Sequence, residues 1–197
     1  MNSLKSLADN ELVQMYQAGN DRAFDELLTR YQSKLYSYIY FIVRNVTLAE
    51  DLFQETFMKV VTTIRQYGYS ESGRFGAWLT RIAHNLIIDY FRQDRSSSTV
   101  SNDESEVDLF NDASLSDDDV ETRITNRQVL SDVRRLIKAL PASQREVVYM
   151  RYYQDLSFRE IADITGVSIN TALGRMRYAL INMRRLADEN GISLSLA

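Results

Sequence analysis

The stretch from Leu156 to Leu186 constrains the fold of this chain more than any other part of it. Ser157, followed three residues later by Glu160, forms a capping box that predicts the start of a helix. Gly166 adopts the left-handed backbone conformation at little cost, so it predicts the end of that helix. Ser168 can then cap a second helix by accepting a hydrogen bond from an early backbone amide. Two helices joined by a turn of three or four residues are typical of a helix-turn-helix.

Positive charge gathers on the second helix of this pair. No acidic residue lies from Ser168 to Ala187, whereas the same stretch contains four arginines: Arg175, Arg177, Arg184 and Arg185. Helical spacing predicts an apolar inner stripe of Ala172, Met176, Ala179, Leu180 and Met183. A basic outer side suits the negatively charged major groove of DNA. An ordinary helical hairpin with a solvated basic side is the alternative that this stretch leaves open.

The composition favours a mostly helical protein without cofactor chemistry. In 197 residues there are one proline, seven glycines and 45% apolar residues, enough for a hydrophobic core. The absence of cysteine excludes a disulfide framework, a thiolate metal site and a cysteine nucleophile. The one histidine, His84, has no second histidine or cysteine beside it, and there is no phosphate-binding glycine loop. We therefore expect no catalytic site, no metal and no cofactor.

Neither a signal peptide nor a membrane span is expected. The first residues lack a basic region followed by an apolar core, and no apolar run is long enough to cross a bilayer. These features predict a cytoplasmic protein.

The net charge of -4 conceals an uneven distribution. Residues 96–121 contain nine acidic residues and no Lys or Arg. Without these nine, the other 18 of the 27 acidic residues stand against 23 basic ones, a balance of +5. The acidic stretch is rich in Ser, Asp and Asn and poor in apolar residues, so we expect a flexible linker. The remaining chain is basic enough for a nucleic-acid partner.

Helical periodicity predicts a bundle of three or four helices in residues 1–95. Asp9 is the expected cap of a first helix and Asn20 or Asp21 that of a second. A capping box from Thr47 to Glu50 predicts the start of a third helix. After a loop at residues 66–73, a last helix runs to about residue 95.

Two outer faces of this bundle stand out. One carries Asp51, Gln54, Glu55 and Met58, where a methionine among acids and amides hints at a partner surface, although a solvated face explains it equally well. The other belongs to the last helix and is expected to point outward with Arg74, Arg81, His84, Asn85, Ile88, Asp89, Arg92 and Arg95. Trp78 and Tyr90 lie on the apolar stripe of the same helix, which favours a place in the core for both.

Residues 122–190 predict a second helical domain. A helix from about Thr122 is ended by Pro141, and a capping box from Ser143 to Glu146 predicts the next one, which runs through Tyr152 and Tyr153. The predicted fold class is therefore all-α: an N-terminal helical bundle (1–95), an acidic flexible linker (96–121) and a C-terminal helix-turn-helix domain (122–190).

Several motifs in this order resemble bacterial sigma factors. AEDLFQETF at residues 49–57 is similar to their polymerase-binding helix. FGAWLTRIA at residues 75–83, followed by DYFR at 89–92, looks like the promoter-melting and -10 segments. Leu140-Pro141, REIA at 159–162 and TALGR at 171–175 look like the -35 domain. Since no intermediate domain separates the two parts, the chain resembles the extracytoplasmic-function group, with a region 2-like and a region 4-like domain.

The resemblance implies a specificity subunit whose partners are core RNA polymerase, promoter DNA and an anti-sigma factor. It implies polymerase binding by Asp51, Gln54, Glu55 and Met58. It implies -10 binding by Tyr67, Tyr69, Arg74, Trp78, Arg81, His84, Asn85, Asp89, Arg92 and Arg95. It implies -35 binding by Arg151, Ser168, Asn170, Thr171, Leu173, Gly174, Arg175, Arg177 and Tyr178.

The sequence departs from the family pattern at Ala172-Leu173-Gly174, where Val, a basic residue and Ser are usual. Leu173 cannot donate a hydrogen bond to a base. Two interpretations of this departure are open: apolar contact with a thymine methyl group, or a close approach of the helix backbone to the DNA. Two other functions stay open for the whole chain. A stand-alone helix-turn-helix regulator would bind DNA without polymerase, and a scaffold or anti-sigma-like helical protein would bind no DNA.

Overall fold

The computed structural model describes residues 4–66, 69, 74–97 and 131–192. Within these ranges the regular elements are helices and no strand occurs, which confirms the all-α prediction. The chain divides into two compact units, Met1–Val107 and Asp108–Ala197. Most of the predicted acidic linker lies outside the described residues, and the predicted domain boundaries stay predictions.

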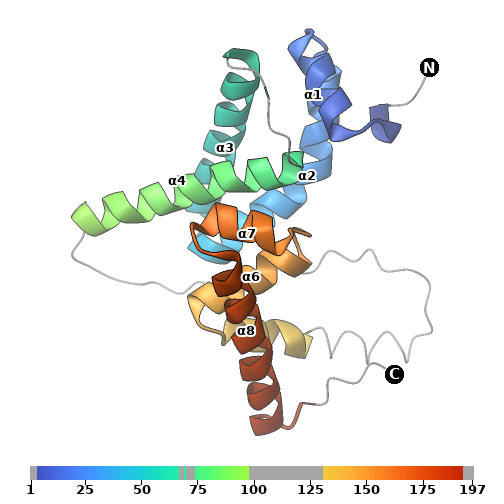
Figure 1. Ribbon diagram of the computed structural model, residues 1–197. Helices are drawn as coiled ribbons and strands as arrows, with labels where there is room; N and C mark the ends of the chain where they lie inside the picture. Colours follow the sequence, from blue (N-terminus) through green and yellow to red (C-terminus); the bar gives the residue numbers. More distant parts are fainter. Residues whose placement is uncertain (1–3, 67–68, 70–73, 98–130, 193–197) are drawn as a thin grey trace. The chain divides into compact units, whose positions relative to one another are not determined.

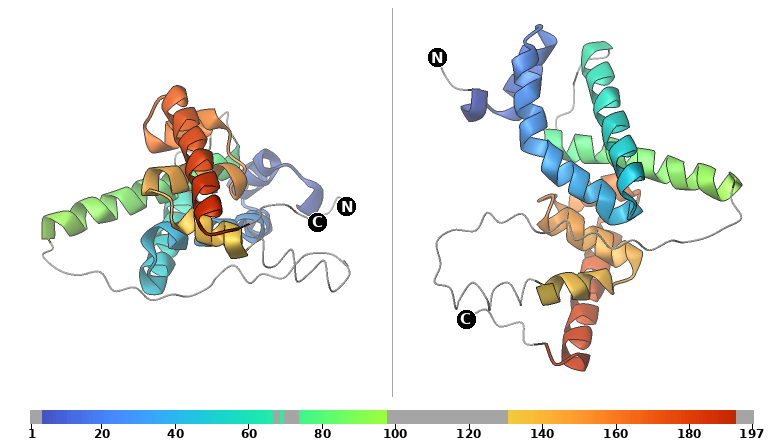
Figure 2. Two further views of the ribbon diagram at one scale, coloured as in Figure 1. Left: turned by 90° about the horizontal axis from the view of Figure 1, so that it is seen from below. Right: turned by 180° about the vertical axis from the view of Figure 1, so that it is seen from behind.

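The first unit is a bundle built around one long central helix (Figure 1). Its elements are the 3-10 turn η1 (Leu4–Ser6) and the helices α1 (Asp9–Gln17), α2 (Asp21–Val43), α3 (Val46–Gln66) and α4 (Phe75–Ser97). Helix α2 packs against α1, α3 and α4, and α4 runs across α2 and α3 in both upright views (Figures 1 and 2). The fully buried side chains include Leu27, Leu35, Tyr38, Ile39, Ile64, Leu79 and Ile87.

Two of the caps predicted for this unit are wrong. The residue before α1 is Ala8, whose backbone N–H donates to the Glu11 carboxylate at 2.7 Å, while Asp9 turns its side chain toward α2. Helix α3 begins at Val46, so the expected capping box from Thr47 to Glu50 does not form. Instead the Asn45 side-chain oxygen accepts a hydrogen bond from an early amide of α3 at 3.0 Å.

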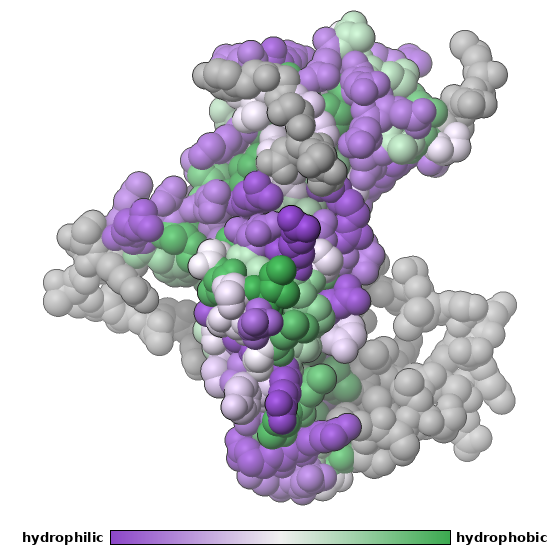
Figure 3. All heavy atoms as spheres, viewed as in Figure 1, coloured by the Kyte–Doolittle hydropathy of each residue, from purple (hydrophilic) through white to green (hydrophobic). Residues whose placement is uncertain are grey.

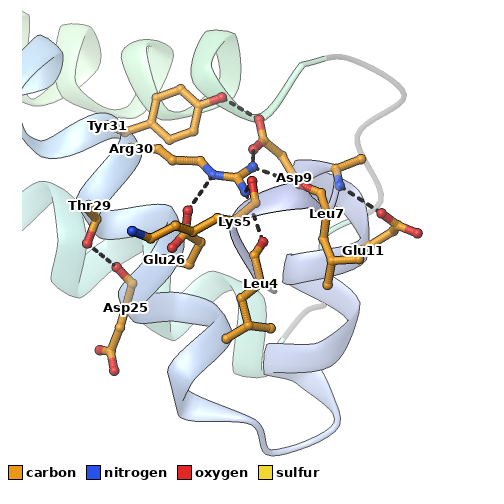
Figure 4. Close-up of polar contacts among 11 residues, drawn as sticks. Leu4, Lys5, Leu7, Asp9, Glu11, Asp25, Glu26, Thr29, Arg30 and Tyr31 are labelled. Carbon is orange, nitrogen blue, oxygen red and sulfur yellow. Dashed lines mark hydrogen bonds and ion pairs between the residues drawn. The ribbon is translucent and has the colours of Figure 1, made fainter. Parts of the chain in front are cut away.

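Arg30 ties the N-terminal segment to α2 (Figure 4). Its guanidinium lies 2.9 Å from the Asp9 carboxylate and 3.0 Å from that of Glu26. It also donates to the backbone carbonyls of three residues at 2.9–3.1 Å: Leu4, Lys5 and Leu7. One charged side chain thereby pairs with three backbone carbonyls near the start of the described chain and with two carboxylates.

Tyr31, the next residue of α2, joins this network and also positions α4. Its hydroxyl donates to the second oxygen of the Asp9 carboxylate. Burial, reinforced by this hydrogen bond, raises the pKa of the Tyr31 phenol. A Cβ atom built on Gly76 would lie 2.7 Å from the Tyr31 ring, so only glycine lets the first turn of α4 pack this closely.

The second unit contains a helical stretch at 131–138 and the helices α6 (Ala142–Tyr152), α7 (Phe158–Thr165) and α8 (Ile169–Glu189). Helix α8 packs against both α6 and α7. The hydrophobic core of the second unit includes Leu136, Val147, Met150, Leu156, Ile161, Ala172 and Ala179. The predicted capping box from Ser143 to Glu146 is wrong, because α6 begins directly after Pro141.

Two residues predicted to face inward lie at the surface. Leu180 is 45% exposed and Tyr90 is 37% exposed. Helical spacing gave each of them a place at the margin of an apolar stripe. The neighbouring helices cover only the centre of that stripe, where small side chains such as Ala179 let them approach.

Replacing Arg30 with Ala should lower the free energy of unfolding by about 1.5–3 kcal/mol, because two half-buried carboxylates and three carbonyls lose a charged donor. Urea denaturation followed by circular dichroism measures this change. Arg22→Ala, which truncates an exposed arginine of the same helix, is the matched control and should change stability by less than about 0.5 kcal/mol. Equal effects of the two substitutions would contradict the anchoring role.

Candidate nucleic-acid interface

The connection between α7 and α8 is fixed by three local interactions that the sequence predicted. The Ser157 hydroxyl accepts from the Glu160 N–H at 3.2 Å, while the Glu160 carboxylate accepts from the Ser157 N–H at 2.7 Å. Gly166 has φ +67° and ends α7. The Ser168 hydroxyl accepts from the Thr171 N–H at 3.0 Å and starts α8. These contacts confirm the helix-turn-helix, in which α7 lies across the start of α8 (Figure 1).

The inner side of α8 is small and apolar, which lets α6 and α7 approach its backbone. Ala172 and Ala179 are fully buried and Met176 nearly so. Between α6 and α8, the Asn182 side-chain amide donates to Gln144 at 2.8 Å. These contacts determine which side of α8 remains accessible.

The accessible side of the first turns of α8 carries most of the residues expected at the -35 site. Asn170, Leu173, Arg177 and Tyr178 are exposed, with Leu173 43% and Tyr178 61% accessible. Arg175 and Gly174 are half-buried. Figure 3 shows hydrophobic side chains among hydrophilic ones on the surface of this unit. The accessible side of α8 is therefore mixed in character and is not a uniform basic stripe.

Three other residues expected at this site are engaged with their own chain. The hydroxyls of Ser168 and Thr171 lie 2.8 Å apart within the α8 cap. Arg151 donates to the Leu156 carbonyl at 3.1 Å, and its guanidinium lies over the Phe158 ring. Arg151 thus stabilises the turn between α6 and α7, a role that the sequence did not predict.

Gly174 is not required by the fold. It lies inside α8, and a Cβ atom built on it would meet nothing within 4 Å. Glycine in a helix interior costs about 0.8–1 kcal/mol relative to Ala. Because Gly174 weakens the helix without improving its packing, its presence is better explained by contact with a binding partner than by the fold.

The outer face of α4 combines basic and amide side chains at helical spacing. Asn85, Asp89 and Arg92 are exposed and Arg81 is half-buried, while Arg74 is exposed just before the helix. Asp89 and Arg92 form an exposed ion pair at 3.4 Å. The predicted exposure of these residues is confirmed, and their role in binding a DNA strand stays a prediction.

Two residues expected to contact the -10 strand lie inside the bundle. His84 is 8% exposed, and its ring Nδ1 lies 3.0 Å from the Tyr38 hydroxyl, so its predicted outward orientation is wrong. Trp78 is 7% exposed and packs against Tyr69 and Phe75, as its place on the apolar stripe indicated. Helical spacing could have predicted the burial of His84, because Thr80 and Ile87 lie one turn before and after it on the same face, and both are buried. Tyr67 and the Arg95 side chain lie outside the described residues.

The outer face of α3 presents the four residues expected to bind a partner. Asp51, Gln54, Glu55 and Met58 are all exposed, and Met58 reaches 71%. Their spacing places them on one side of the helix, opposite buried Leu52, Thr56 and Val60. A long exposed methionine is an adaptable contact for a protein partner.

No cluster of three or more His, Cys, Asp or Glu side chains in the described ranges is suited to a metal ion. None of the helices in the same ranges combines the length and the apolarity that crossing a bilayer demands.

A helix-turn-helix whose second helix has no acidic residue before Asp188, in a chain that also contains a helical bundle with two further polar faces, is typical of a DNA-binding protein of the helix-turn-helix class. Residues 27–97 match Sigma-70 region 2, and residues 130–177 match Sigma-70, region 4. The chain therefore belongs to the extracytoplasmic-function sigma factors, which direct promoter-specific transcription by RNA polymerase.

Individual relatives agree with this membership. The chain is 38% identical over 157 residues to the ECF RNA polymerase sigma factor BldN of Streptomyces coelicolor, covering 79% of this chain and 57% of BldN. It is 32% identical over 178 residues to the RNA polymerase sigma factor CarQ of Myxococcus xanthus, covering 90% of this chain and 96% of CarQ. The fold is similar to that of CnrH, with a TM-score of 0.62 at 23% identity over 93% of this chain and 99% of CnrH.

Gly174→Ala should raise the free energy of unfolding by about 0.8–1 kcal/mol, since the added methyl group enters open space in a helix interior. Gly166→Ala is the contrasting variant. It should lower the free energy of unfolding by about 1–2 kcal/mol, because Gly166 has a positive φ that an L side chain adopts only with strain. Chemical denaturation of both variants measures the two signs, and destabilisation by Gly174→Ala would show that the fold needs this glycine.

Proposed function

We propose that three separate surfaces of this sigma factor perform its three binding tasks. The outer side of the first turns of α8 binds the -35 duplex, the outer face of α4 binds the unpaired -10 strand, and the outer face of α3 binds core polymerase. The observation that carries the proposal is the exposed, acid-free start of α8, held by caps that position a helix for the major groove.

On α8, Asn170, Leu173 and Arg177 are the proposed base contacts, with Tyr178 beside them. The first residues of a recognition helix meet base edges, whereas residues further along meet the backbone. Ser168 and Thr171 form the cap of α8, so their proposed role is to position the helix on the DNA. Arg175 is assigned to a phosphate, which needs charge and no defined hydrogen-bond pattern.

On α4, Arg74, Arg81, Asn85, Asp89 and Arg92 are the proposed contacts of the -10 strand. Basic side chains follow the phosphates of an opened strand, and amides can bind base edges. Tyr67, Tyr69 and Arg95 stay in the proposed -10 set. Buried Trp78 and His84 support this surface from inside the bundle.

On α3, Asp51, Gln54, Glu55 and Met58 form the proposed polymerase contact. Polymerase then holds both units of one chain near the promoter. Binding of either unit to DNA raises the effective concentration of the other, so neither must bind tightly alone. This division of labour involves binding only and assigns the chain no catalytic step.

An anti-sigma factor is proposed as the regulatory partner. CnrH was solved in complex with the cytosolic domain of CnrY, and the sigma factor RpoE of Bartonella quintana with the anti-sigma factor NepR. A protein that covered the α3 or α8 face of the present chain would compete directly with polymerase or promoter DNA.

The whole proposal is tested by transcription from a randomised promoter library with core polymerase, followed by sequencing of the transcripts. We expect this protein to enrich a bipartite promoter with defined -35 and -10 elements. A transcript set identical with and without the protein would contradict it.

Gln54→Ala combined with Glu55→Ala should weaken assembly with core polymerase at least tenfold, because a charged and an amide contact are lost together on one exposed face. Fluorescence anisotropy of the labelled protein, titrated with core polymerase, measures the affinity. The double variant Asp25→Ala with Gln32→Ala removes the same chemical groups from exposed positions of α2 and should bind as the wild type does. Unchanged affinity of the α3 variant, with unchanged helix content, would refute the assignment.

Arg177→Ala should weaken binding of the polymerase complex to the -35 duplex by about 1–3 kcal/mol if the arginine contacts a base. The loss of binding should then be large for the selected sequence and small for a duplex in which the base pair contacted by Arg177 is changed. Arg185→Ala removes an exposed arginine two turns further along α8, where it pairs with Glu189 at 2.6 Å, and should have little effect on sequence preference. Full activity of Arg177→Ala on every promoter would remove Arg177 from the interface.

A further inference from the structure

Four residues form a continuous stripe on the accessible side of the first turns of α8. Asn170, Leu173, Gly174 and Arg177 are spaced by three and four residues, which brings them to one face of a helix. The stripe has a hydrogen-bonding side chain at each end and none in the middle. Its length along the helix is about 10 Å, roughly three base-pair steps.

The fold does not account for the middle of this stripe. Leu173 is 43% exposed, whereas the leucines and alanines that hold this unit together are buried. Next to it, Gly174 leaves space that a Cβ atom could occupy without meeting any atom within 4 Å. An exposed leucine beside a notch in a helix creates apolar surface that the free protein leaves in water.

Thymine is the base whose major-groove edge matches this surface. It presents a C5-methyl group there, while adenine and cytosine present amino groups and guanine presents two acceptors. Contact with leucine would remove water from those polar groups without giving them a partner, which costs free energy. A methyl group gains free energy from the same contact.

We propose that Leu173 recognises a thymine of the -35 duplex through its C5-methyl group, and that Gly174 makes room for that base edge beside the helix backbone. This inference rests on the proposed function of α8 as the -35 contact. Specificity at the centre of the stripe then comes from apolar contact, flanked by the polar side chains of Asn170 and Arg177.

The test uses the full chain assembled with core polymerase and the promoter duplex selected from the library. Each thymine of the -35 element is replaced, one at a time, by deoxyuridine, which deletes only the methyl group. One replacement should weaken binding about three- to fivefold, the effect expected for one buried methyl group. The remaining replacements should leave the affinity unchanged.

Variants at Leu173 link this effect to the side chain. Leu173→Ala should abolish the difference between thymine and uracil at that position, whereas Leu173→Met, which keeps an apolar side chain, should retain it. Leu180→Ala is the matched control, because Leu180 is 45% exposed on the same face two turns later and beyond the first turns that meet base edges. It should preserve the full uracil effect.

Gly174→Ala tests the second half of the proposal. It should lower affinity for the selected duplex at least fivefold while raising the melting temperature, so a folding defect cannot explain the loss. Wild-type affinity of this variant would overturn the claim that the notch admits a base edge.

Failure of the inference differs from failure of the proposed function. A complex that ignores a scrambled -35 duplex contradicts the role of α8 altogether. A complex that needs the -35 duplex but tolerates uracil at every thymine, or a Leu173→Ala variant that keeps the wild-type uracil effect, contradicts the methyl contact alone.

Discussion

The crossing of α7 over α8 is the constraint on which the proposed -35 surface depends. The reciprocal bonds of Ser157 and Glu160, the positive φ of Gly166 and the Ser168 cap fix the lengths and the meeting point of the two helices. Because alanines line the buried side of α8, its neighbours approach its backbone closely. That approach leaves a single side accessible, and every proposed DNA contact of α8 lies on it or at its edge.

Affinity and sequence preference have different physical origins on this surface. Arginines attract phosphates at long range, which gives binding without regard to sequence. Sequence preference needs groups that match one base edge and oppose the others. Leu173 is suited to that task because it has no charge to satisfy elsewhere and no hydrogen bond to offer a wrong base. The basic residues and the apolar notch of α8 therefore complement each other.

Much of the interface could be predicted from short-range patterns. The capping box at Ser157 and the end of α7 at Gly166 depend on residues three to nine positions apart, so the sequence contains all the information needed. The exposed face of α3 follows from helical spacing alone. The caps at Thr47 and Ser143 failed because other residues nearby, Asn45 and Pro141, begin those helices first. A local sequence pattern does not show which of several nearby capping residues begins the helix.

By itself, the sequence determined most of the helices, their apolar sides and the helix-turn-helix, because these depend on residue spacing within one segment. It also carried the resemblance to sigma factors, which depends on short motifs and their order along the chain. Only the tertiary structure decided which margins of each stripe a neighbouring helix covers. It buried His84 against Tyr38 from α2, exposed Leu180, and drew Arg151 into the turn before α7. The physical reason is that burial depends on contacts between segments far apart in the chain, which periodicity within one helix does not contain.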